Sequence, residues 1–133
     1  MKSEQYQSII EATYRLVGKG KLDAFFEYLA DDITWTECEG FPYGGTYVGK
    51  EDILQNVHMR LGTEWDQFTA KDIDYTFNEE KVMVFGKYSG TYKQTNKYFE
   101  ADFVHYYTFN DAGKIQSFRQ VTDSVKVLEA MTE

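Results

Sequence analysis

Cysteine, proline and long hydrophobic runs are scarce in this sequence. Cys38 and Pro42 are the only residues of their types among 133. A single cysteine cannot form an internal disulfide, so a disulfide-stapled secreted scaffold is excluded and a reducing compartment is favoured. No segment approaches the roughly 20 apolar residues of a membrane span, and the opening stretch MKSEQYQSII lacks the apolar run of a signal peptide. We therefore expect a cytoplasmic protein without a membrane partner.

Positive charge is also scarce. The 14 Lys and Arg residues are outnumbered by 22 Asp and Glu residues, for a net charge of −8, and no basic stripe could replace the counterions of nucleic acid. The two histidines, His58 and His105, lie on different predicted elements and form no HxxxH or Cys/His cluster. The glycines of YGGTYVG have neither P-loop nor dinucleotide spacing. We therefore expect no nucleic acid partner, no metal and no organic cofactor.

Aromatic residues, in contrast, are abundant. Tyr, Phe and Trp make up 17% of the chain, and hydrophobic residues make up 42%. Such a chain can bury enough apolar surface to offset the entropy lost on ordering, so intrinsic disorder is excluded. The length suits one domain with a sizeable core. Because no linker or repeat divides the sequence, we expect a single domain over residues 1–133.

Hydrophobic periodicity predicts helices first and strands afterwards. Helical spacing predicts helices at 3–17, 21–30 and 50–61 and a closing helix from Asp123. Turn residues and alternation predict an extended segment at 33–40, a loop or short hairpin at 41–49, and strands at 66–77, 81–94, 97–109 and 114–122. This order indicates an α+β fold in which helices cover one face of an antiparallel sheet. Gly86 and Gly90, inside one strand, predict that the sheet curls around the helices.

Strand alternation and helical spacing place ionisable side chains among inward-facing aromatic residues. His105 shares its strand face with Phe103, and Glu37 shares its face with Trp35. On the first helix, Tyr14 lies on the apolar stripe. Three polar groups are therefore predicted to point toward an interior that is otherwise aromatic.

Each of these groups also has a purely structural explanation. Glu37 could be solvated at a strand end or paired with Arg15 or Arg119, or it could be buried with the raised pKa that suits a general base. His105 could be a core histidine with satisfied hydrogen bonds or a site residue. Tyr14 taken alone would be a core residue whose hydroxyl finds a partner.

Three segments carry a family resemblance: GKLDAFFEYLADDITWTE, the GxxxI spacing from Gly49 to Ile53, and KYFEADFVHYYTFNDAGKIQSFRQVTD. Together they resemble the SnoaL-like and ketosteroid-isomerase-like branch of the nuclear transport factor 2-like superfamily, over about residues 6–131. The resemblance implies a cone of three N-terminal helices on a strongly curved antiparallel sheet, with a short C-terminal helix and a deep apolar pocket. It also implies homodimers that pair through the outer sheet face, without a metal or organic cofactor.

The resemblance further implies roles for particular residues. Tyr14 is similar to the tyrosine that donates to the substrate oxyanion, and Glu37 stands where the isomerases keep a proton-shuttling aspartate. His105 stands where they keep a protonated acid as the second oxyanion donor, so a neutral imidazole would donate instead. Gln120 is the inward polar residue that completes the site in the polyketide-cyclase relatives. Asp123 matches a recurrent aspartate, either as an acid/base group or as the N-cap of the last helix.

Two functions fit these residues. The first is a cofactor-independent isomerase, cyclase or dehydratase that moves protons on a small apolar carbonyl compound, with Glu37 as base and Tyr14 and His105 as oxyanion donors. The alternative is a non-catalytic module that binds an aromatic or lipid-like ligand. A protein-interaction domain ranks last, because nothing in the sequence marks a partner surface.

The same pattern predicts the pocket and the homodimer surface. The predicted pocket walls are Trp35, Trp65, Tyr88, Phe103, Tyr107, Phe118 and Gln120. The predicted dimer contacts, on the opposite face of the late strands, are Tyr98, Val104 and Tyr106.

Overall fold

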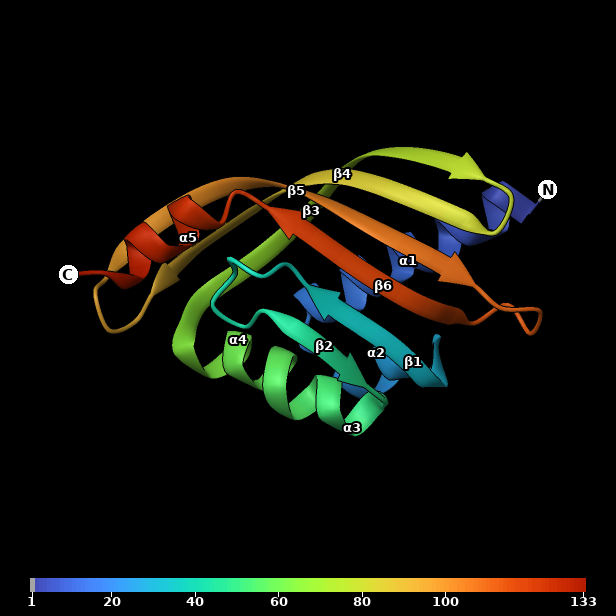
Figure 1. The fold of residues 1–133 in the computed structure, drawn as a ribbon, viewed down its shortest axis with the longest axis horizontal. Coiled ribbons are helices and arrows are strands. Elements are labelled where there is room, and N and C mark those ends of the chain that lie inside the picture. Colours follow the sequence, from blue (N-terminus) through green and yellow to red (C-terminus); the bar gives the residue numbers. More distant parts are fainter. Residues whose placement is uncertain (1) are drawn as a thin grey trace.

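The computed structural model describes residues 2–133, in which helices pack on one six-stranded sheet (Figure 1). The helices are α1 (Lys2–Gly18), α2 (Leu22–Phe26), α3 (Lys50–Ile53), the π-helical turn η1 (Leu54–His58), α4 (Met59–Glu64) and α5 (Ser124–Met131). The strands are β1 (Leu29–Glu37), β2 (Gly45–Val48), β3 (Trp65–Asn78), β4 (Lys81–Tyr92), β5 (Lys97–Phe109) and β6 (Ile115–Thr122). The predicted α+β architecture is confirmed. No helix among the described residues is long and apolar enough to cross a membrane.

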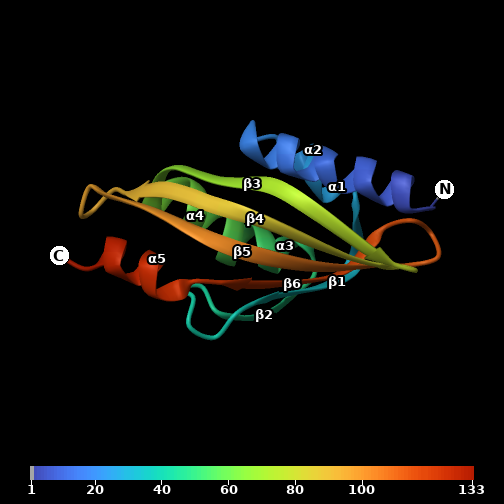
Figure 2. The same cartoon turned by 90° about the horizontal axis from the view of Figure 1, so that it is seen from above.

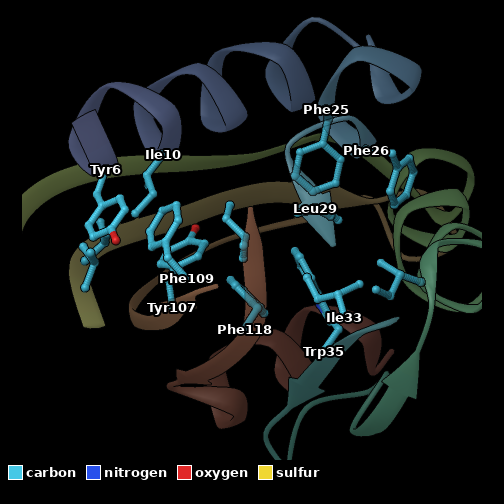
Figure 3. Close-up of a cluster of buried hydrophobic side chains, with 14 of the residues drawn as sticks. Tyr6, Ile10, Phe25, Phe26, Leu29, Ile33, Trp35, Tyr107, Phe109 and Phe118 are labelled. Atoms are coloured by element: carbon cyan, nitrogen blue, oxygen red, sulfur yellow. The ribbon is translucent and has the colours of Figure 1, made fainter. Parts of the chain in front are cut away.

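The helices α1 and α2 lie together on one side of the sheet (Figure 2). The helical spacing of α1 directs Tyr6 and Ile10 toward the sheet, where Tyr6 stacks on Phe109 with ring centroids 3.9 Å apart. Phe25 of α2 meets Trp35 of β1 edge-on at 6.1 Å (Figure 3). Each such side chain contributes roughly 1.5–3 kcal/mol through its burial. The resulting core holds the helices over the concave face of the sheet.

Gly86 allows close packing inside the sheet. A Cβ atom at this position would lie 2.3 Å from the carbonyl oxygen of Lys71 and 2.3 Å from the ring of Phe103. The Phe103 ring therefore lies against bare backbone, and it stacks on His105 with centroids 3.9 Å apart. The register between β3 and β4 shifts next to this glycine. Gly86 thus accommodates both a local irregularity of the sheet and the ring that supports His105.

The structure differs from the predicted elements in three details. The helix predicted at 21–30 ends at Phe26, because Leu29 already pairs with Ile115 of β6 as part of β1. The helix predicted at 50–61 continues to Glu64 and contains the π-helical turn η1. The sheet is antiparallel except where β1 runs parallel to β6, with Trp35 opposite Phe118. Alternation with period two is the same for both strand directions, so the sequence pattern does not distinguish them.

Candidate functional site

A cavity of about 310 Å³ lies between the helices and the inner face of the sheet. Its wall combines α1, β1, the η1–α4 helix and the central strands. Among the predicted site residues, those that line it are Tyr14, Glu37, His105, Trp35, Trp65, Tyr88, Tyr107 and Phe118. A mostly apolar wall with a few convergent polar groups is the usual composition of a small-molecule site.

Three side chains form a hydrogen-bonded chain through His105. The Tyr14 hydroxyl lies 2.6 Å from Nδ1 of His105, and the Tyr88 hydroxyl lies 2.5 Å from Nε2. Tyr107 in turn donates to the Tyr14 hydroxyl at 3.0 Å. Both ring nitrogens are therefore engaged, so a ligand would meet a tyrosine hydroxyl rather than the imidazole. The direct oxyanion donation predicted for His105 does not match this geometry.

The charge state of His105 determines which hydrogens remain for a ligand. Its side chain is 4% exposed, and burial holds the pKa of His105 well below its usual range, so the ring is neutral and carries one hydrogen. Three hydrogens, one on the ring and one on each of the Tyr14 and Tyr88 hydroxyls, serve two hydrogen bonds. One hydroxyl hydrogen is therefore left over. It belongs to Tyr14 when Nδ1 carries the ring hydrogen, and to Tyr88 when Nε2 carries it.

Glu37 ends β1 as a buried acid with one free oxygen. It is 4% exposed; Oε1 accepts a hydrogen bond from Trp35 Nε1 at 3.2 Å, and Oε2 has no partner among residues 2–133. Neither Arg15 nor Arg119 forms an ion pair with it in the described part of the chain. Burial raises the pKa of Glu37 to about 7, and the hydrogen bond from Trp35 opposes that rise only in part.

This raised pKa makes stability depend on pH. Below pH 4.5 Glu37 is protonated whether the chain is folded or unfolded. Between pH 4.5 and about 7 the unfolded chain loses the proton while the folded chain keeps it, so the free energy of unfolding falls. Replacing Glu37 with Gln removes this loss, and the stability of the variant relative to the wild type should rise by about 3 kcal/mol between pH 4 and pH 8. Urea denaturation at both pH values measures the free energy of unfolding of the two proteins. If the difference between them is the same at pH 4 and pH 8, Glu37 is not a buried acid with a raised pKa.

Three predicted site residues lie away from the cavity wall. Phe103 packs behind His105. Gln120 is fully buried, its Oε1 accepts a hydrogen bond from the backbone N–H of Cys38 at 3.3 Å, and it does not line the cavity among the described residues. Asp123 is exposed and occupies the N-cap position of α5 without a side-chain capping bond. An inward strand face therefore includes residues that pack as well as residues that face the cavity.

Some polar residues of the wall were not predicted, and His58 is the ionisable one among them. His58 lines the cavity from η1, a place that the search for metal-ligand spacing does not indicate. A signal was present, because His58 follows Leu54 by four residues and precedes Leu61 by three, which places it beside the apolar stripe of its helix. Residues 2–133 contain no group of three or more His, Cys, Asp or Glu side chains arranged to hold a metal ion.

Comparisons with known proteins agree with the fold. An NTF2-like protein from Burkholderia thailandensis has 40% sequence identity and a TM-score of 0.90, over 97% of this chain and 98% of that chain. TerC, co-crystallised with polyporic acid, has 22% identity and a TM-score of 0.86, over 96% and 98% of the two chains. A hypothetical protein from Catenulispora acidiphila with a ketosteroid isomerase-like fold, in complex with trimethylamine, has 17% identity and a TM-score of 0.80, over 92% and 90%.

The last two similarities concern the fold alone. No curated protein matches the sequence. The family model of the SnoaL-like domain matches residues 10–118, which is most of the chain and includes Tyr14, Glu37 and His105. The chain therefore belongs to the SnoaL-like family and has the NTF2-like fold of its structural neighbours.

Proposed function

We propose that the cavity binds a small apolar carbonyl compound and that Glu37 moves a proton at the carbon next to the carbonyl. One observation carries this proposal: Glu37, whose Oε2 has no partner among residues 2–133, lines the same cavity as the hydrogen-bonded residues Tyr14, His105 and Tyr88. A base and an oxyanion donor in one apolar site are what enolisation requires. A carboxyl pKa of about 7 suits a base that works near neutral pH.

The proposed step uses only groups of the chain. The proton leaves the carbon for Oε2 of Glu37, and the electron pair of the broken C–H bond moves through the carbonyl carbon onto its oxygen. We assign the leftover hydrogen to Tyr14, whose oxygen then accepts from both Tyr107 and His105. Two donors behind it make the Tyr14 hydroxyl a stronger donor to the enolate oxygen.

The enolate then has three outcomes within the proposed reaction class. Return of the proton from Glu37 to a different carbon isomerises the ligand. Attack of the enolate carbon on a second carbonyl of the same molecule closes a ring, and that oxygen takes the proton. If the next carbon carries a hydroxyl group, that group can take the proton from Glu37 and leave as water, which dehydrates the ligand. Each outcome regenerates the carboxylate.

The test is exchange of the α-protons of 1-tetralone, a small apolar ketone, in D2O, followed by proton NMR. Because the base must be ionised, the enzyme-dependent rate should rise about tenfold per pH unit below the pKa of about 7 and level off above it. At pH 5 only about 1% of Glu37 would be ionised, so the rate should be about 100-fold below the plateau. A rate equal to that of buffer at every pH would contradict the proposal.

The second candidate is a binding module that holds an aromatic or lipid-like ligand without chemistry. The aromatic side chains of the cavity wall favour it as well, and so does the presence of small molecules in the structures of TerC and the Catenulispora acidiphila protein. The same NMR experiment separates the two functions. Saturable binding of 1-tetralone without exchange above the buffer rate would support the module.

We also propose that a second copy of the chain covers the outer face of the sheet. Phe85, Val104 and Val121 lie side by side across β4, β5 and β6, and they are 43%, 36% and 56% exposed. Tyr98 is also exposed, whereas Tyr106 is half-buried. Light scattering at micromolar concentration should give twice the chain mass of 15.6 kDa, and Val104→Asp should give the monomer mass. A monomeric wild type would contradict this assembly.

A further inference from the structure

His58 lies among aromatic rings at the end of the π-helical turn. Its ring centroid is 5.0 Å from that of Phe25, 6.0 Å from that of Phe26 and 5.4 Å from that of Trp35. Its Nε2 atom is buried and has no hydrogen-bond partner among residues 2–133. The side chain also lines the cavity. A π-helical turn inside a helix is itself frequent at functional sites.

An unpartnered imidazole nitrogen in such a place is costly for the free protein. Phe or Leu would fill the same aromatic surroundings without leaving a polar atom unsatisfied. Burial lowers the pKa of His58 to about 4, so the ring is neutral at physiological pH and offers one donor and one acceptor nitrogen. A hydroxyl group, which both donates and accepts, can therefore satisfy Nε2 in either tautomer.

His58 and His105 lie at two ends of one aromatic wall. The ring centroids of His58 and Trp35 are 5.4 Å apart. Phe118 stacks on Trp35 with centroids 3.7 Å apart, and the His105 ring lies edge-on to Phe118 at 4.6 Å. All four side chains line the cavity. A flat ligand lying along Trp35 and Phe118 would place one end at the Tyr14–His105–Tyr88 chain and the other end at His58.

We propose that His58 is a specificity-determining residue that binds a hydroxyl at the end of the ligand remote from its carbonyl. The substrate class is then a hydroxylated aryl ketone or a related hydroxylated ring with an enolisable carbonyl. This inference rests on the proposed function for the position of the carbonyl. The assignment of the hydroxyl rests on His58 alone.

The test compares the dissociation constants of 1-tetralone with those of 6-hydroxy- and 7-hydroxy-1-tetralone, by NMR titration. The wild type should bind the better hydroxy compound about tenfold more tightly, which is the usual value of a buried hydrogen bond that would otherwise be missing. His58→Phe should reduce this ratio to about one, while His58→Gln, whose amide can still bind a hydroxyl, should restore most of it. Met59→Ala, on the exposed side of the same helix, should keep the wild-type ratio.

The outcomes separate this inference from the proposed function. A wild type without preference for either hydroxy compound, or a preference that persists in His58→Phe, would overturn the role of His58 even if α-proton exchange is observed. A preference that depends on His58, without exchange above the buffer rate, would support the hydroxyl site and contradict the catalytic step. Failure of all three ketones to bind at millimolar concentration would overturn both.

Discussion

Replacing Glu37 with Gln should slow α-proton exchange of 1-tetralone by about 10³-fold, within the range expected for loss of a general base. The amide cannot accept the proton, while its oxygen can still accept the hydrogen bond that Trp35 Nε1 gives to Oε1 at 3.2 Å. Shape and anchoring are therefore retained. Exchange rates from NMR at pH 8, where the wild-type carboxyl is ionised, measure the effect. At pH 5, where the wild-type carboxyl is protonated, the dissociation constant of 1-tetralone should change by less than about threefold, since a neutral amide and a neutral carboxyl have similar size.

Glu129→Gln provides the matched control, because Glu129 is exposed on α5, away from the cavity. It should leave both exchange and binding at wild-type values. If Glu37→Gln keeps more than one tenth of the wild-type exchange rate, the base is another group and the proposed step is wrong. If it loses 1-tetralone binding together with exchange, the carboxyl supports the cavity instead of transferring the proton.

Tyr14→Phe should slow the same reaction by about 10²-fold, the lower end of the range for removal of one oxyanion donor. The substitution removes the hydroxyl that lies 2.6 Å from His105 and 3.0 Å from the Tyr107 hydroxyl. The developing charge on the carbonyl oxygen then loses its nearest hydrogen. Tyr107→Phe should cost less than about tenfold, because the Tyr107 hydroxyl donates to Tyr14 and therefore acts on the developing charge through the Tyr14 hydroxyl.

Tyr88→Phe determines which tautomer of His105 operates. If Nδ1 carries the ring hydrogen, Tyr88 only donates to Nε2 and its loss should cost less than the loss of Tyr14. A larger effect for Tyr88→Phe than for Tyr14→Phe would place the leftover hydrogen at Tyr88 and reverse the assignment. If Tyr14→Phe and Tyr88→Phe both exchange at the wild-type rate, this chain of residues has no oxyanion role.

Much of the fold followed from local patterns. The late strands were predicted within two residues of their observed ends, because one face of each is buried and the other is not. The end of α2 was missed, since Leu29 suits the apolar side of a helix as well as a strand and its pairing with Ile115 is decided far away in the sequence. The parallel pairing of β1 with β6 was missed for the same reason.

The candidate site was predictable as far as strand faces and the apolar stripe of α1 determine it. Tyr14, Glu37 and His105 were predicted to point inward, and all three line the cavity. What the pattern does not contain is the position of the empty space, which depends on how the helices fill the concave face. Gln120 is buried beneath the wall, and His58 reaches the cavity from the edge of a helical stripe.

The hydrogen bond from Trp35 to Glu37 has a stereochemical consequence. In the proposed reaction, Oε1 is held by Trp35 Nε1, so Oε2 is the oxygen left to take up the proton. A single atom fixed on the β1 side of the cavity reaches one face of a flat ligand. Removal and return of the proton would then be suprafacial, and a new stereocentre formed by that return would have a single configuration.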